Sequence, residues 1–367
     1  MLTDDMPWGH RSIARAINSF LKEKQDNGEN IEVNYSEVKQ TFNYLGDVYT
    51  FLYRYFPLSN KLSNIFLEND VGRELFIEVT SSNMLHLEQV VRKYKPDLII
   101  CSYCFHSHSL VKIRETTDLR FELWTVVADP WTSSRLSFVD GADLNLVYDG
   151  VALKQAISYG FDKKNVLVTG WWTRQEMYKN NIEKKNGEPV VFIGGGSLGT
   201  NSITKFLPIL LLIKQKCTII FNTGTDKLAF KMVAQYKKMF DRLRKNSGVT
   251  IKNLGWIDNM AEVLSMSDIV FGKAGPNFLF DVVASKKPFV AITHMGGQED
   301  GNIDLILKKK LGWVKEGLGE AEDFLLEYLK QPEKYNKKYA KTIEIEAINN
   351  EKTMEKIWKK IKCPTKS

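Results

Sequence analysis

The stretch Gly272-Lys273-Ala274-Gly275-Pro276-Asn277 separates an apolar run that ends at Phe271 from a helical pattern that contains Asp281. It predicts a strand that turns directly into a helix, because proline is favoured in the first turn of a helix. A second turn, residues 296–302, follows the next apolar run. Open α/β sheets bind ligands at the carboxyl ends of their strands. The two turns therefore predict one binding site.

The residue types in these turns indicate the class of ligand. A helix start leaves backbone N–H groups that face an anion such as phosphate. Asp281, one turn inside the helix, can reach ribose hydroxyls, and Lys273 either contacts phosphate or braces the loop. The run Gln298-Glu299-Asp300-Gly301-Asn302 supplies donors and acceptors for sugar hydroxyls. Phosphate, ribose and sugar together describe a nucleotide-sugar.

The rest of the chain alternates apolar runs with amphipathic stretches, which is typical of βαβ units and an α/β fold. Its 367 residues can bury two cores. The expected strands are residues 98–101, 123–127, 144–147, 166–168, 189–193, 218–221, 269–271 and 289–292, and residues 1–3 resemble the tail of a first strand. Helical patterns cover residues 85–94 and 203–214. Several strands are continuously apolar, which indicates burial on both faces of parallel sheets.

A hydrophilic stretch at residues 179–188 predicts the boundary between two domains. We expect an N-terminal Rossmann-like domain at residues 1–178 and a C-terminal one at 179–345. The last segment, 346–367, is expected to form a helix that crosses back to the N-terminal domain.

Composition excludes several classes of protein. No apolar run approaches the roughly 18 to 20 residues that span a bilayer, and no signal peptide is recognisable. The net charge of +7 fits either an anionic membrane surface or a lysine-rich proteome, and no nucleic-acid-binding motif accompanies it. Cys101 and Cys104 have no second pair to complete a zinc site. We expect a cytoplasmic protein with reduced thiols.

Residues 273–276 and 297–302 resemble the donor-site signature of family 28 glycosyltransferases. Within that family the chain is most similar to the monogalactosyldiacylglycerol synthases and the diacylglycerol glucosyltransferases. The resemblance implies a GT-B fold, in which two Rossmann-like domains with parallel sheets face a cleft. It also implies a UDP-sugar donor in the C-terminal domain, an acceptor in the N-terminal domain, and neither a cofactor nor a catalytic metal.

The resemblance also implies roles for two residues near the N-terminus. In Asp4-Asp5-Met6-Pro7-Trp8-Gly9-His10-Arg11, Asp5 precedes His10 by the family's interval of five residues. Asp5 is then the candidate general base for the acceptor hydroxyl, with His10 near the reaction centre. The alternative is that Asp4 or Asp5 only caps the following helix. The family's glycines are replaced here by Met6-Pro7-Trp8.

Donor contacts are implied at the ends of several strands. Arg174 would meet the diphosphate or form an interdomain salt bridge, and Trp256 and Ile257 would line the uracil pocket or pack at a strand end. The full set of candidate donor-binding residues is Arg174, Gly195, Gly196, Ser197, Gly224, Trp256, Ile257, Lys273, Gly275, Pro276, Asn277, Asp281, Gln298, Glu299 and Asn302.

The acceptor side is expected in the aromatic segment at residues 44–67 and near Asp129. An aromatic and basic helix can lie in a membrane interface, or it can pack on the N-terminal sheet. The candidate acceptor or membrane residues are Trp8, Tyr53, Phe56 and Trp131. Lipid-acceptor relatives have a His after the Asp that matches Asp129, whereas this chain has Trp131-Thr132-Ser133.

Together these features predict an inverting, metal-independent transferase that moves a hexose from a UDP-sugar to a diacylglycerol-type hydroxyl. It would act as a peripheral protein on the inner face of the membrane. The alternatives are a polyprenyl-linked or soluble acceptor, or a non-catalytic UDP-sugar-binding protein. A UDP-sugar 2-epimerase would share the fold, but Gln298-Glu299 in this setting favours a transferase.

Overall fold

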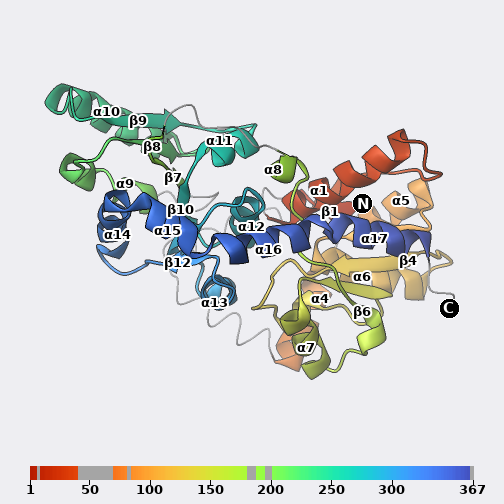
Figure 1. Cartoon of the computed structure of the whole chain (residues 1–367). Helices are drawn as coiled ribbons and strands as arrows, with labels where there is room; N and C mark the ends of the chain where they lie inside the picture. Colours follow the sequence, from red (N-terminus) through yellow and green to blue (C-terminus); the bar gives the residue numbers. More distant parts are fainter. Residues whose placement is uncertain (6–8, 40–68, 81–83, 180–186, 195–200, 364–367) are drawn as a thin grey trace. The chain divides into compact units, whose positions relative to one another are not determined.

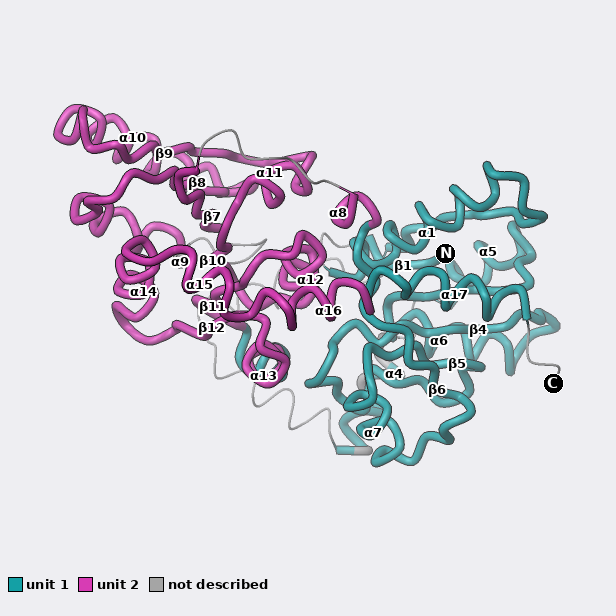
Figure 2. Tube along the Cα trace, in the orientation of Figure 1, with its two compact units in different colours: residues 1–174, 295–301, 350–367 teal, residues 175–294, 302–349 magenta. Residues whose placement is uncertain are grey.

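The computed structural model describes residues 1–5, 9–39, 69–80, 84–179, 187–194 and 201–363. The chain forms two compact units (Figure 2). Unit 1 comprises residues 1–174, 295–301 and 350–367, and unit 2 comprises residues 175–294 and 302–349. Each unit holds its own six-stranded parallel sheet with helices, so the α/β fold expected from the alternating pattern is confirmed.

The sheet of unit 1 has the strand order β2-β1-β3-β4-β5-β6, with all neighbours parallel. Its strands are β1 (Leu2–Asp4), β2 (Ser36–Val38), β3 (Leu98–Cys101), β4 (Glu122–Val126), β5 (Leu144–Val147) and β6 (Val166–Val168). The first strand is only three residues long, yet it pairs with two neighbours. The residues that follow β1 and β3 therefore emerge at the same edge of the sheet.

The helices of unit 1 include the connections that its parallel topology requires. They are α1 (Gly9–Asp26), α4 (Asp70–Thr80), α5 (Met84–Tyr94), α6 (Cys104–Thr116), α7 (Gly150–Ser158) and α17 (Thr353–Lys362), with short 3-10 turns η2 (Arg135–Ser137) and η3 (Lys163–Asn165). The terminal helix α17 belongs to unit 1. Lys24 of α1 binds Glu355 of α17 at 2.8 Å, and Ile357 and Trp358 are buried.

The sheet of unit 2 has the order β12-β11-β10-β7-β8-β9, again with every neighbour parallel. Its strands are β7 (Val190–Gly194), β8 (Cys217–Asn222), β9 (Val249–Leu254), β10 (Ile269–Lys273), β11 (Phe289–Thr293) and β12 (Gly312–Val314). Strands β7 and β10 lie in the centre. The order reverses there, which in doubly wound sheets is the point where ligands bind.

The other helices of the described residues lie wholly or mostly in unit 2 (Figure 1). These are α8 (Glu176–Lys179), α9 (Asn201–Thr204), η4 (Pro208–Leu212), α10 (Lys227–Leu243), α11 (Met260–Met266), α12 (Pro276–Ala284), α13 (Asp300–Lys308), α14 (Glu320–Lys330), α15 (Pro332–Lys338) and α16 (Ala340–Glu351). The continuous helix expected over residues 203–214 is wrong. Pro208 has no N–H to continue α9, so a separate 3-10 turn begins there.

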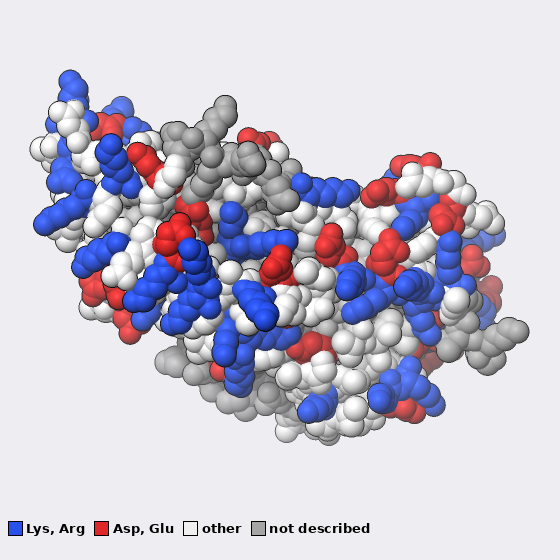
Figure 3. All heavy atoms as spheres, viewed as in Figure 1, with Lys and Arg blue, Asp and Glu red and all other residues white. Residues whose placement is uncertain are grey.

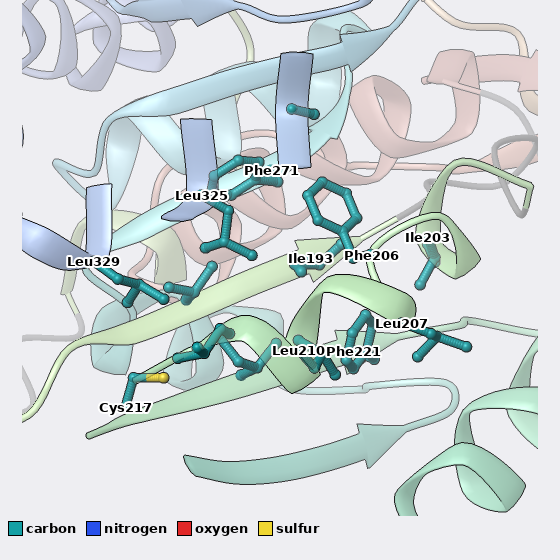
Figure 4. Close-up of a cluster of buried hydrophobic side chains, with 14 of the residues drawn as sticks. Ile193, Ile203, Phe206, Leu207, Leu210, Cys217, Phe221, Phe271, Leu325 and Leu329 are labelled. Atoms are coloured by element: carbon teal, nitrogen blue, oxygen red, sulfur yellow. The ribbon is translucent and has the colours of Figure 1, made fainter. Parts of the chain in front are cut away.

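A buried apolar cluster holds unit 2 together (Figure 4). The view shows side chains from the central strands packed against α9, η4 and α14. Phe206 and Phe271 meet edge to face with 5.5 Å between ring centroids, and both are fully buried. Such pairs add about 0.5–1.5 kcal/mol to the stabilisation from burial alone. This core makes the sheet a rigid support for the turns at its carboxyl edge.

Candidate functional site

The carboxyl ends of three neighbouring strands of unit 2 meet at one edge. In register, Gly272 of β10 faces Gly194 of β7, and Lys273 faces Thr293 of β11. The Ala274 N–H then donates to the carbonyl oxygen of Thr293 at 2.8 Å. The turns that follow β10 and β11 are therefore adjacent, as the sequence predicted.

The turn after β10 leads straight into helix α12. Gly275 is the N-cap residue and Pro276 follows at the first helical position, where its missing N–H removes nothing from the helix. Among the residues that the structure describes, none caps this end of α12 with its side chain. The positive end of the helix dipole thus lies at the edge of the sheet, where it favours an anion.

Asn302 joins the two turns. Its side-chain Nδ2 donates to the carbonyl oxygen of Ala274 at 2.8 Å, and the residue is 1% exposed. The other amide atom, Oδ1, is buried and accepts no hydrogen bond from any residue that the structure describes. An unpaired buried acceptor is costly unless a ligand or water satisfies it. The atom therefore marks a position where a hydroxyl or N–H donor of a ligand is favoured.

Two charged side chains of the same region are largely buried. Lys273 at the end of β10 is 8% exposed, and Asp281 in α12 is 9% exposed. Both take part in interactions within the fold. Charged groups are retained at such depth when they are paired or bind a ligand.

Phe278 packs over two glycines, a feature that sequence reasoning missed. A Cβ on Gly272 would lie 2.5 Å from Phe278 Cε1 and 3.1 Å from the Gly194 carbonyl oxygen. A Cβ on Gly194 would lie 3.5 Å from Phe278 Cζ. Glycine is therefore required at Gly272 for close packing of α12 onto the sheet edge. The signal in the sequence is the apolar strand ending in glycine, followed six residues later by phenylalanine.

The ends of β8 and β9 form the next part of this edge. Asn222 Nδ2 donates to the carbonyl oxygen of Gly255 at 2.7 Å, and Gly224 has a left-handed φ of 54°. Trp256 is 71% exposed and its indole N–H binds Asp258 at 2.8 Å. Ile257 is half-buried. Trp256 is therefore a surface side chain here rather than part of the core.

Residues 295–301 follow β11 and belong to unit 1. Glu299 is 5% exposed, and its Oε2 accepts from the N–H of Met295 at 2.6 Å. Gln298 is half-buried. One carboxylate oxygen of Glu299 thus shapes the loop, and Gln298 is the more accessible member of the pair.

His294 and Glu316 form a pair that sequence reasoning missed. His294 follows β11, and its Nδ1 lies 2.8 and 2.9 Å from the two carboxylate oxygens of Glu316. Both side chains are about one-quarter exposed, at 27% and 24%. No local spacing in the sequence links two residues that are 22 positions apart.

In unit 1, His10 lies in the first turn of α1, next to the end of β3. Its Nδ1 is 2.9 Å from the carbonyl oxygen of Ser102, so in the neutral ring Nδ1–H donates and Nε2 is an acceptor. Tyr103 holds the ring edge to face at 5.2 Å between centroids. The backbone carbonyl of Ser102, just after β3, therefore determines the tautomer of the neutral His10 ring.

The two carboxylates before α1 differ in environment. Asp4 is fully buried at the end of β1, and burial raises its pKa above the ordinary value. Asp5 follows at a bend and is half-buried, and Arg11 Nη1 donates to its backbone carbonyl oxygen at 3.2 Å. Among the described residues, neither carboxylate accepts a hydrogen bond from a backbone N–H of α1. The helix-cap interpretation thus has no support in this part of the chain.

Arg174 and Trp131, which the sequence singled out, lie in packed surroundings, as does His106. Arg174, at the end of unit 1, is half-buried and engaged within the fold. The indole N–H of Trp131 points at both carboxylate oxygens of Asp149, at 3.2 Å each. His106 is buried and its Nε2 lies 3.2 Å from the carbonyl oxygen of Val38, so this histidine is structural.

Some predicted site residues lie outside the described part of the chain. They are Trp8, Tyr53, Phe56, Gly195, Gly196 and Ser197. Within the described ranges, no three His, Cys, Asp or Glu side chains are grouped closely enough to hold a metal ion. The helices in those ranges include none with the length and apolar character to cross a bilayer.

Two family models match consecutive parts of the chain. The model for monogalactosyldiacylglycerol (MGDG) synthase matches residues 10–171, and the model for the glycosyltransferase family 28 C-terminal domain matches residues 190–360. Monogalactosyldiacylglycerol synthase 1 of Arabidopsis thaliana is 20% identical over 332 residues, which cover 85% of this chain and 61% of that protein. The chain spans 54% and 61% of the length of two curated relatives that it matches.

Solved structures support the fold. MurG of Acinetobacter baumannii superposes with a TM-score of 0.61 at 13% identity, covering 99% of this chain and 98% of that one. The UDP-GlcNAc 2-epimerase of Neisseria meningitidis bound to UDP-GlcNAc gives a TM-score of 0.63 at 12% identity, with the same coverage. At these identities the likeness concerns the GT-B architecture alone. With both halves matched by family models and the α/β architecture shared, this chain belongs to the family 28 glycosyltransferases.

Proposed function

We propose that this protein transfers a hexose from a UDP-sugar to the hydroxyl of a diacylglycerol-type lipid at a membrane surface. The observation that carries the proposal is the edge of the unit 2 sheet, where the start of α12 adjoins Oδ1 of Asn302, and among the described residues neither has a side-chain partner. The first feature suits a diphosphate and the second suits a sugar hydroxyl.

In this proposal the donor lies along the carboxyl ends of β8 to β11. The turn Gly275-Pro276-Asn277 and Lys273 bind the diphosphate, and Asp281 binds the ribose. Gln298, Glu299 and Asn302 contact the hexose. The backbone at Trp256 and Ile257, with Gly224 beside it, holds the uracil. The family resemblance adds Arg174 and the turn Gly195-Gly196-Ser197 to the diphosphate contacts.

The chemical step is a single displacement. The carboxylate of Asp5 takes the proton of the acceptor hydroxyl while the hydroxyl oxygen forms a bond to the anomeric carbon. The bond from that carbon to the diphosphate breaks, and UDP leaves with the electron pair. His10 lies in the first turn of α1, five residues after Asp5, and the Nε2 atom of its neutral ring can accept a hydrogen bond. One displacement inverts the configuration at the anomeric carbon.

No metal ion takes part in this proposal. The charge that develops on the departing diphosphate is stabilised by the helix start and by cationic side chains. The relatives named as monogalactosyldiacylglycerol synthases support a lipid acceptor. We place the protein, in this proposal, at the cytoplasmic face of the membrane as a peripheral protein.

The direct test supplies the full chain with a panel of radiolabelled UDP-sugars and a total lipid extract. We expect label in a lipid product whose anomeric configuration is opposite to that of the donor, with turnover unchanged in EDTA. Label in a polyprenyl-linked or water-soluble product would show that the acceptor is of that kind and not a diacylglycerol. Hydrolysed or 2-epimerised sugar without transfer would overturn the proposal.

The variant Asp5→Asn tests the base. We expect kcat to fall by about 10²–10⁴-fold while UDP-sugar binding, measured by calorimetry, stays unchanged. Asp118→Asn is the matched control, because Asp118 is an exposed carboxylate of unit 1 with 81% side-chain exposure. Full turnover in the Asp5 variant would remove Asp5 from the reaction.

A further inference from the structure

Helix α10 has an exposed apolar stripe in addition to its buried face. Its buried residues are Ala229, Val233 and Phe240. A second row of apolar side chains faces outward, namely Leu228 (69% exposed), Met232 (43%), Met239 (41%) and Leu243 (65%). At about 100° per residue these four side chains fall within about 60° of the helix circumference. They form one continuous stripe, which we call the α10 stripe.

A row of cations borders the α10 stripe on the side away from the core. It consists of Lys227, Lys231, Lys238 and Arg242, which occupy the adjoining sector of about 60°. All four residues are exposed, and none forms an ion pair with any residue that the structure describes. The acidic residue Asp241 of the helix is paired with Lys237, in a different sector. The charge beside the stripe is therefore uncompensated within the described fold.

The apolar and basic surface continues past the end of the helix. Arg244 Nη2 donates to the carbonyl oxygen of Ile213 at 2.6 Å, which brings the end of α10 beside η4. Leu212 of η4 is 62% exposed, and Lys214 and Lys245 are exposed on either side of that contact. At the end of unit 2 where Figure 1 draws α10, Figure 3 shows Lys and Arg side chains together with uncharged surface and some acidic side chains.

We propose that the α10 stripe is a membrane-docking surface for anionic lipid. An amphipathic helix with apolar side chains on one face and Lys or Arg beside them binds in the interface plane. The stripe would enter the boundary between headgroups and acyl chains, and the cations would reach lipid phosphates. Leucine and methionine fit this role because they tolerate the irregular packing of lipid chains.

The positive charge beside the α10 stripe favours an anionic bilayer, rather than a second copy of the chain, as the partner of this surface. Two copies that met through this face would bring two rows of unpaired cations together, which is unfavourable. An anionic surface neutralises the row, and the binding then weakens as salt rises. The surface lies on unit 2, whereas the aromatic segment expected to face a membrane lies in residues 44–67. The proposal therefore adds a second contact with the membrane.

The test measures binding of the full chain to vesicles without any sugar donor. We compare phosphatidylcholine vesicles with vesicles that contain 30% phosphatidylglycerol, a composition of about one anionic lipid in three. The wild type should bind the anionic vesicles and lose binding in about 0.5 M salt. The inference takes from the proposed function only the location at a membrane. If the protein bound vesicles but transferred no sugar, the proposed function would fail and this inference would still hold.

The stripe variant Leu228→Gln/Met232→Gln/Met239→Gln/Leu243→Gln should lose about tenfold or more of the anionic-vesicle affinity. Lys231→Gln/Lys238→Gln/Arg242→Gln should lose the preference for anionic lipid. Ile345→Gln/Ile348→Gln is the matched control, because these residues of α16 are also exposed, at 50% and 40%. The variants alter exposed positions, and circular dichroism checks their fold.

A direct probe separates the α10 stripe from any other membrane contact. A fluorophore is placed on Met239→Cys in a Cys363→Ser background, since Cys363 is the exposed cysteine of the described residues. We expect a blue shift on anionic vesicles and quenching by lipids brominated in their acyl chains. An unshifted, unquenched probe on vesicle-bound protein would overturn the proposal. So would a concentration-dependent dimer that the stripe variant abolishes in the absence of vesicles.

Discussion

The side-chain amide of Asn302 donates to the carbonyl oxygen of Ala274 at 2.8 Å, and this bond ties the turn after β10 to the helix after β11. The two residues are 28 positions apart and both are buried. The bond fixes the orientation of the amide, so Oδ1 is the atom that remains for a ligand. The bond holds the two separate motifs next to each other, as the proposed donor site requires.

Asn302→Asp should destabilise the protein by about 1–3 kcal/mol or more at pH 7. The carboxylate cannot donate to the Ala274 carbonyl oxygen, and it is buried without a partner. The loss should shrink as the pH falls toward 5, because a protonated carboxyl group can donate again. Urea denaturation at both pH values measures the effect. Asn34→Asp is the control, since Asn34 Nδ2 makes an exposed bond to Glu32. Equal losses in the two variants would contradict the assigned role of the bond.

Gly272→Ala should destabilise unit 2 by about 1–3 kcal/mol, because the new methyl group overlaps the Phe278 ring. The double variant Gly272→Ala/Phe278→Leu should recover part of this loss, and a double-mutant cycle measures the coupling. Gly296→Ala is the control, because a Cβ there meets nothing within 4 Å. If the double-mutant cycle gave no coupling energy, the backbone at the end of β10, rather than the Phe278 ring, would be the reason that glycine is required at Gly272.

Stability should fall as the pH drops from about 6.5 toward 4. Burial lowers the pKa of His106 to about 4, so the unfolded chain binds a proton in this window before the folded chain does. Above pH 6.5 the neutral His106 ring contributes about 3 kcal/mol at most to the free energy of unfolding, and this contribution is lost as the pH falls toward 4. Burial also lowers the pKa of His108.

His106→Gln, whose amide can still donate to Val38, should flatten the pH dependence of the unfolding free energy. His86→Gln, an exposed change in α5, should leave the slope unchanged. Equal slopes in the wild type and the His106 variant would show that this ring does not govern acid sensitivity.

Lys273→Met should weaken UDP binding by about tenfold and reduce its salt dependence, because a cation near the diphosphate is removed. Stability should fall as well, because Lys273 takes part in interactions within the fold that methionine cannot make, so the affinity is measured at a temperature where the variant is folded. Calorimetry with UDP measures the affinity. Lys286→Met, at the far end of α12 where Lys286 pairs with Glu344, is the control. Unchanged affinity would assign Lys273 to bracing the loop.

Sequence patterns located most of the strands because strands buried on both faces are continuously apolar. The strands β3, β5 and β6 have the predicted bounds. Three strands were missed for a physical reason. Strand β9 contains polar Thr250, Lys252 and Asn253, as expected for the edge of the sheet, and β2 and β12 have only three residues each.

The helix expected at residues 203–214 was wrong because apolar content outweighed the effect of Pro208. The run Ile209-Leu210-Leu211-Leu212-Ile213 fits a buried helix by composition. Proline removes a hydrogen-bond donor and disfavours the preceding helical turn, and the tertiary structure accommodates the run as η4.

The amino-acid sequence by itself determined the class of fold, the family and the two turns that we propose as the donor site, because these depend on local patterns of apolar residues, glycine and proline. Only the tertiary structure decided which atoms meet. The bond from Asn302 to Ala274, the Phe278 ring over Gly272 and the pairing of His294 with Glu316 join residues brought together by sheet register. Register is set by packing of the whole core, and no local stretch encodes it.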